Sequence, residues 1–81
     1  MYYVLNVSKG YICHQGKEQE CYQYVYNARN MTADLLRIMT SETKRKVCTR
    51  EGGLRANYSR MNTFSLIIVI GQMNREDEGD G

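Results

Sequence analysis

The chain has 81 residues, of which 42% are hydrophobic and 25% charged, enough for one small globular domain but not for two hydrophobic cores. Its net charge of +2 conceals an uneven distribution: residues 1–74 carry ten Lys and Arg against five Asp and Glu, and four of the nine acids follow Asn74. We therefore expect a compact basic domain over residues 1–74 and a disordered acidic tail over residues 75–81. A basic domain favours anionic partners, either nucleic acid or an acidic protein surface.

The cysteines and the apolar runs argue against several further classes of protein. The three cysteines have no paired spacing, so the sequence predicts neither a disulfide framework nor a zinc site, and we expect no metal or cofactor. The N-terminus lacks the basic start and apolar stretch of a signal peptide, which favours a cytoplasmic location. The longest apolar run, residues 64–70, is far shorter than the ~20 residues that span a bilayer, so no membrane contact is expected.

The first elements along the chain are two predicted strands. Residues 2–7 are β-branched and aromatic and lead into a Ser-Lys-Gly turn, and residues 11–15 are rich in apolar side chains before Gly16. Together they predict a β-hairpin.

Residues 17–30 fit either a strand or a helix. Three tyrosines alternate with period two, which in a strand places their rings on one face. From Cys21 to Met39, however, apolar residues also recur at helical spacing, compatible with one helix from about residue 18 to 46. Because Tyr, Val and Asn are poor helix formers, we favour the strand.

The second half of the chain predicts one helix and further strands. We expect a helix from Thr32 to about Lys44 in either case, then a hairpin of residues 46–50 and 54–58 around Gly52-Gly53. Residues 64–70 are the most apolar segment and predict a central strand. The predicted fold is α+β, with an antiparallel sheet of about five strands in the order β-β-β-α-β-β and one main helix packed on one face.

The candidate binding residues are cations of the second half and tyrosines of the first. If Arg50 and Arg55 oppose each other across the predicted hairpin, their like charges repel, and an anionic partner would relieve this repulsion. The structural alternative is that basic residues offset helix dipoles and keep the protein soluble. Tyrosine suits base stacking and protein interfaces, but also fills small cores. The candidates are Lys44, Arg45, Lys46, Arg50, Arg55, Arg60, Tyr22, Tyr24 and Tyr26.

No catalytic constellation is apparent. His14 follows Cys13 directly, and adjacent residues of a strand point to opposite faces, so the two are not expected to act as a nucleophile with its base. The carboxylates form no evident acid and base pair, and Gly52-Gly53 lacks the Lys-Ser/Thr of a phosphate-binding loop. We therefore expect a protein that is not an enzyme.

In build alone, as a short proline-free chain with one helix on a sheet, the sequence resembles the small accessory and inhibitor proteins of phages and mobile elements, including anti-CRISPR proteins. This resemblance implies a non-catalytic protein that docks on a larger protein or protein–nucleic-acid complex and inhibits or modulates it. The alternative is direct nucleic-acid binding, with Arg50, Arg55 and Arg60 on phosphates and the tyrosine rings on bases. A small ribonuclease toxin is the third hypothesis.

Overall fold

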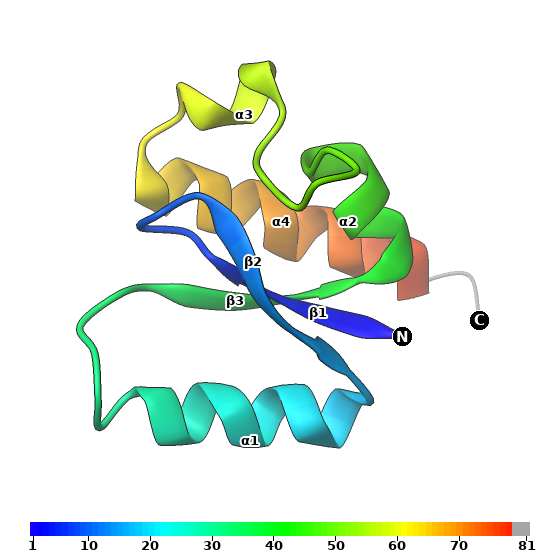
Figure 1. Cartoon of the computed structure of the whole chain (residues 1–81). Coiled ribbons are helices and arrows are strands. Elements are labelled where there is room, and N and C mark those ends of the chain that lie inside the picture. The colour runs from blue at the N-terminus through cyan, green and yellow to red at the C-terminus, as the bar shows by residue number, and fades with distance from the viewer. Residues whose placement is uncertain (79–81) are drawn as a thin grey trace.

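The computed structural model describes the backbone of residues 1–78 and the side chains of residues 1–77. This part of the chain forms three strands and four helices (Figure 1). In order they are β1 (Tyr2–Asn6), β2 (Tyr11–Gly16), α1 (Glu18–Ala28), β3 (Leu36–Thr40), α2 (Ser41–Val47), α3 (Ala56–Ser59) and α4 (Thr63–Glu78).

The strands form one antiparallel sheet in the order β2-β1-β3. In the middle strand, Tyr3 pairs with Gln15 on one side and Met39 on the other, and the β1–β2 register shifts between Val4 and Leu5. The α+β class and the N-terminal hairpin are thus confirmed. The sheet has three strands in the described chain rather than about five, and the element order is β-β-α-β-α-α-α.

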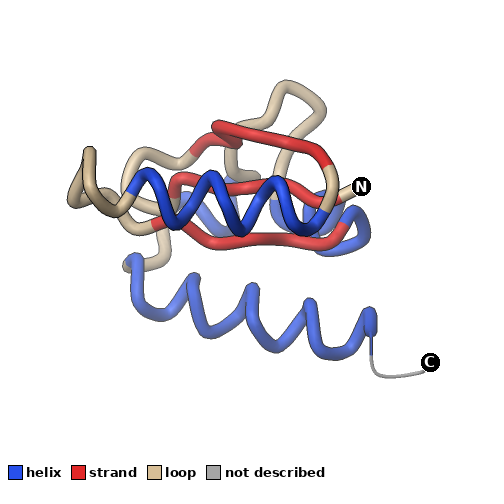
Figure 2. The backbone as a smooth tube through the Cα atoms, turned by 90° about the horizontal axis from the view of Figure 1, so that it is seen from below, coloured by secondary structure: helices blue, strands red, loops and turns tan. Residues whose placement is uncertain are grey.

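Helices lie on both faces of the sheet, which corrects the expectation of one main helix on one face. Helix α1 lies across one face, and α2 and α4 cover the other (Figure 1). Leu5, Met39, Leu66 and Ile70 are buried in the core between the sheet and α4, whereas Cys21 is the buried residue of α1. Seen from below, α4 is displaced sideways from α1, so the two helices do not stack directly over each other (Figure 2).

The strand predicted for residues 17–30 is wrong, since this segment contains α1. Acidic residues in the first turn suit the positive end of the helix, and the Lys17 amide donates to the Glu20 carboxylate at 3.4 Å. The helical spacing buries Cys21 against the sheet and leaves Tyr22 and Tyr26 exposed. Burial of this stripe outweighs the modest penalty that Tyr and Val carry in helices.

The helix predicted for residues 32–44 is also wrong, because the segment contains β3 and the start of α2. Residues 36–40 pair with β1 along their whole length. The Thr40 hydroxyl then accepts a hydrogen bond from the Thr43 amide at 3.1 Å, which caps α2 and fixes its first residue at Ser41. Long-range strand pairing therefore overrides the local helical pattern.

The predicted central strand at residues 64–70 belongs to α4. Asn62 accepts a hydrogen bond from the Ser65 amide at 2.8 Å near the start of the helix. Leu66 is 1% exposed, whereas Ile68, two residues later, is 60% exposed, as helical spacing requires. The hairpin predicted for residues 46–58 reduces to one bridge, Cys48 with Leu54, followed by the short helix α3.

Residues 75–78, expected in the acidic tail, continue α4. The Asp77 carboxylate accepts hydrogen bonds from the hydroxyls of Thr40 at 2.9 Å and Thr43 at 2.6 Å, and it pairs with Lys46 at 3.2 Å. The Thr43 hydroxyl is the main cause that lowers the pKa of Asp77 below its ordinary value. Residues 79–81 of the predicted tail lie outside the described residues.

Candidate functional site

Three of the six predicted basic residues are engaged in ion pairs or hydrogen bonds within the molecule. Lys46 pairs with Asp77 and Arg45 with Glu42. Arg55 donates two hydrogen bonds to the main-chain oxygen of Arg45, at 3.1 and 3.3 Å, near the end of α2. These contacts favour the structural interpretation of the cluster, because surface cations offset the negative end of a helix.

Of the other three predicted cations, Lys44 and Arg50 line one hollow together, and Arg60 is not among its lining residues. The Lys44 amine lies 5.4 Å from the centre of the Tyr3 ring, a cation–π contact. Arg50 is exposed in the turn before Gly52-Gly53, and Arg60 is exposed at the end of α3.

The predicted tyrosines lie on α1, across the sheet from α2, so the structure does not unite them with the six cations. Tyr24 stacks on His14 with ring centres 4.6 Å apart and an angle of 8° between the planes. Tyr22 and Tyr26 lie one helical turn apart and are exposed. The two exposed rings are available to a partner, whereas Tyr24 is partly buried against β2.

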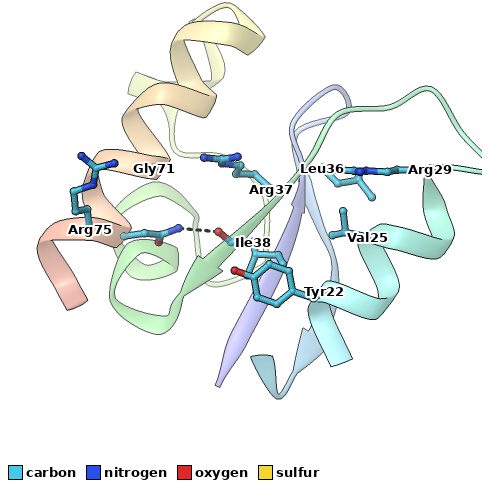
Figure 3. Close-up of a pocket in the computed structure, with 9 residues that line it drawn as sticks. Tyr22, Val25, Arg29, Leu36, Arg37, Ile38, Gly71 and Arg75 are labelled. Carbon is cyan, nitrogen blue, oxygen red and sulfur yellow. Dashed lines mark hydrogen bonds between the residues drawn. The ribbon is translucent and has the colours of Figure 1, made fainter. Parts of the chain in front are cut away.

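A groove of about 380 Å³ runs along the outer edge of β3, between α1 and α4 (Figure 3). Its walls come from three elements far apart in the sequence, and of the predicted site residues only Tyr22 takes part. The lining residues are Tyr22, Val25, Arg29, Leu36, Arg37, Ile38, Gly71, Asn74 and Arg75.

Three arginines make the groove basic. Arg29 closes one end of α1, Arg37 projects from β3 and Arg75 from α4 (Figure 3). No acid lines the groove, and within residues 1–77 none of the three guanidinium groups has an ion pair. Arg37 passes close to the backbone of α4, because a Cβ atom at Gly71 would lie 3.1 Å from its Nη2. The groove therefore presents positive charge that the described part of the chain does not neutralise.

The floor of the groove is the free edge of the sheet. The Asn74 side chain bonds to this edge as a neighbouring strand would: its Nδ2 donates to the Ile38 carbonyl at 2.8 Å (dashed line in Figure 3), and its Oδ1 accepts from the Thr40 amide at 3.1 Å. Antiparallel pairing directs the main-chain groups of alternate residues away from the partner strand. The amide and carbonyl of Leu36 and the amide of Ile38 thus face the groove beyond Asn74.

Exposed apolar side chains flank the groove on both sides. Tyr22 and Tyr26 stand on the α1 side. On α4, Phe64 and Ile68 are exposed and lie in one helical row with Gly71 and Arg75, spaced by three or four residues. Sequence reasoning missed this site because its arginines belong to three separate segments. The available signal was the row on α4, visible once residues 64–75 are treated as helical.

The Cys13–His14 pair departs from its expected geometry without becoming a catalytic centre. Cys13 lies at the register shift of β2, and both side chains contact Tyr24: His14 by stacking and Cys13 by a hydrogen bond that raises the Tyr24 pKa. The expectation that the two face opposite ways is therefore wrong, because the bulge interrupts strict alternation. The Cys13 thiol donates to the Val4 carbonyl at 3.6 Å rather than to the imidazole.

Metal and membrane sites are likewise not found in the described residues. All three cysteines are free thiols, and residues 1–77 contain no group of three or more His, Cys, Asp or Glu side chains placed to hold a metal ion. Burial raises the pKa of the Cys21 and Cys48 thiols, which disfavours their reactive thiolate forms. No helix in the described chain has both the length and the apolar character to cross a membrane.

Comparison of the chain with protein-family models, curated proteins and solved structures finds no significant match.

Proposed function

We propose that this protein is a small non-catalytic binding protein that docks on a larger macromolecule through the β3-edge groove and inhibits or modulates it. The proposal rests on three arginines that surround an open sheet edge and have no ion pair within the described residues. Arginine and tyrosine are enriched among the residues that dominate protein interfaces, where they combine large contact area with directed hydrogen bonds.

The apolar flanks favour a protein partner. Phe64 and Ile68 expose large hydrophobic surfaces beside the groove, and such patches on small proteins mark interaction surfaces. A phosphate backbone gains nothing from an aliphatic side chain, whereas a protein buries it. We therefore place a protein, alone or within a nucleoprotein complex, ahead of free nucleic acid.

Nucleic-acid binding remains the second candidate because of one feature of α1. Tyr22, Tyr26 and Arg29 succeed each other at helical spacing and line one continuous surface hollow. Stacking rings beside a guanidinium group suit a single strand, whose bases stack while its phosphates bind cations.

Affinity capture separates the two candidates. The tagged protein is used to capture partners from a lysate of the cells that encode it, with and without nuclease treatment. Our proposal predicts a protein partner that survives nuclease and whose activity falls when the purified proteins are combined. Loss of all binding after nuclease treatment would support the nucleic-acid alternative instead.

A further inference from the structure

Resting on the proposed groove function, we infer that the partner supplies an extended acidic segment that pairs with β3 as a fourth strand of the sheet. Within the described residues, the order β2-β1-β3 leaves β3 with a strand on one side only. Extended peptides bind such edges through main-chain hydrogen bonds, and alternate side chains provide specificity.

Asn74 sets where the added strand ends. Its amide already bonds to Ile38 and Thr40, so an incoming strand finds that half of the edge occupied. The main-chain groups of this edge that remain for an added strand are the amide and carbonyl of Leu36 and the amide of Ile38. The site is therefore short, and two or three main-chain hydrogen bonds hold the strand beside Leu36.

The walls of the groove differ in chemistry, which specifies the side chains of the added strand. Arg37 extends toward Gly71 of α4, and Arg75 lies on the same helix, so this wall is cationic. The opposite wall carries Val25 and Tyr22 of α1, and its one cation, Arg29, lies at the end of that helix. Successive residues of a strand face opposite walls. A matching segment therefore alternates acidic residues, toward α4, with apolar residues, toward α1.

Charge argues against a second copy of this chain at the edge. Pairing of β3 with β3 of another copy would bring two sets of Arg29, Arg37 and Arg75 together, and like charges across paired strands are destabilising. The same charges attract an acidic peptide, and their attraction weakens with added salt.

The test uses the full-length protein and a blocked, fluorescently labelled peptide of alternating Glu and Val, eight residues long. A peptide with Lys in place of Glu controls for charge. A third peptide, N-methylated at alternate residues on its hydrogen-bonding edge, retains the charge but cannot pair fully with a strand. Fluorescence anisotropy measures affinity, and amide hydrogen exchange by NMR locates the new main-chain hydrogen bonds.

We expect saturable binding of the Glu–Val peptide alone and slower exchange of the Leu36 and Ile38 amides in the complex. Arg37→Glu should weaken binding by about tenfold or more, whereas Arg50→Glu, an equal charge change outside the groove, should change it little. Circular dichroism establishes that both variants are folded.

Three results would overturn the inference. They are no binding at millimolar peptide, equal binding of the N-methylated peptide without protection of the two amides, or protection of those amides in the free protein through self-association. None of these decides whether a macromolecule docks on the groove, since the capture experiment tests that separately. A single-stranded oligonucleotide that binds while the peptide does not would favour the nucleic-acid alternative and refute strand addition.

Discussion

Replacing Leu66 with Ala should destabilise the protein far more than replacing Ile68 with Ala, although both residues belong to one apolar run. Leu66 is 1% exposed and packs in the cluster that contains Leu5, Met39 and Ile70. Truncation of such a buried leucine costs ~2–5 kcal/mol, a large share of the stability of a small domain.

Ile68 is 60% exposed, so truncation removes less than half of the buried surface that a fully buried isoleucine would lose. Complete burial of an isoleucine contributes ~1.5–3 kcal/mol, so the loss is about 1 kcal/mol or less, and the better helix propensity of Ala offsets a few tenths. Each kcal/mol corresponds to ~4–8 °C in the melting temperature of a domain of this size. Leu66→Ala should therefore lower the melting temperature by roughly 10 °C or more, and Ile68→Ala by only a few degrees.

Thermal and urea unfolding followed by circular dichroism measure both differences. The comparison is a direct test of α4, because residues two apart share a face in a strand but lie on nearly opposite sides of a helix. Equal losses of stability in the two variants would refute the helix and support the strand predicted for residues 64–70.

Three further predictions concern α4. Asp77→Asn should lower the melting temperature at neutral pH, while Glu76→Gln leaves it nearly unchanged. Because folding lowers the Asp77 pKa, the stability that Asp77 contributes is present above the ordinary Asp pKa and is lost as the pH falls through the folded-state value. The melting temperatures of the wild type and Asp77→Asn should therefore converge in acid, and parallel pH profiles would contradict a stabilising role of the Asp77 carboxylate. Deleting residues 75–81 should lower the melting temperature because it removes Asp77 from Thr43 and Lys46, and an unchanged melt would show that this end of α4 contributes no stability. Gly71→Ala should raise stability by ~0.5–1 kcal/mol, since Ala favours the helix and the exposed Arg37 side chain can shift away; a lower melting temperature would show that Arg37 is fixed against α4.

Sequence patterns predicted the elements whose signals are local. The hairpin of β1 and β2 follows from two β-rich segments around Gly10, whose φ of 81° suits a tight turn. The alternative of one helix from about residue 18 to 46 rested partly on the spacing of Cys21, Val25 and Ala28, and helix propensity argued against it; only its first part, Glu18–Ala28, is helical as α1. Burial of one face of α1 decided between the two.

Other elements depend on contacts that the local sequence does not specify. Residues 36–40 have helical spacing but become a strand because β1 offers a partner along their length. Residues 64–70 were assigned to a strand because they are the most apolar run of the chain, and the acidic residues that follow were assigned separately to a tail. Asp77 in fact binds Thr40 and Thr43, which extends the helix to Glu78.

The candidate site was the least predictable feature. Local clustering drew attention to residues 44–46, whose cations are largely engaged within the molecule. Arg29, Arg37 and Arg75 are far apart in the sequence and gather only when β3 lies between α1 and α4. Of the predicted site residues only Tyr22 lines the groove, which otherwise agrees just with the general expectation of a basic surface, and the binding role of the groove stays a proposal.

The most direct test of the docking proposal is the affinity of the captured partner for two charge-reversed proteins. One carries Arg37→Glu and Arg75→Glu in the groove, and the other carries Arg50→Glu and Arg60→Glu, an equal change of net charge outside it. We predict that the groove variant, once shown to be folded, loses most of its affinity while the control retains it. Equal affinities for the two variants, or a greater loss in the control, would contradict the groove as the binding surface.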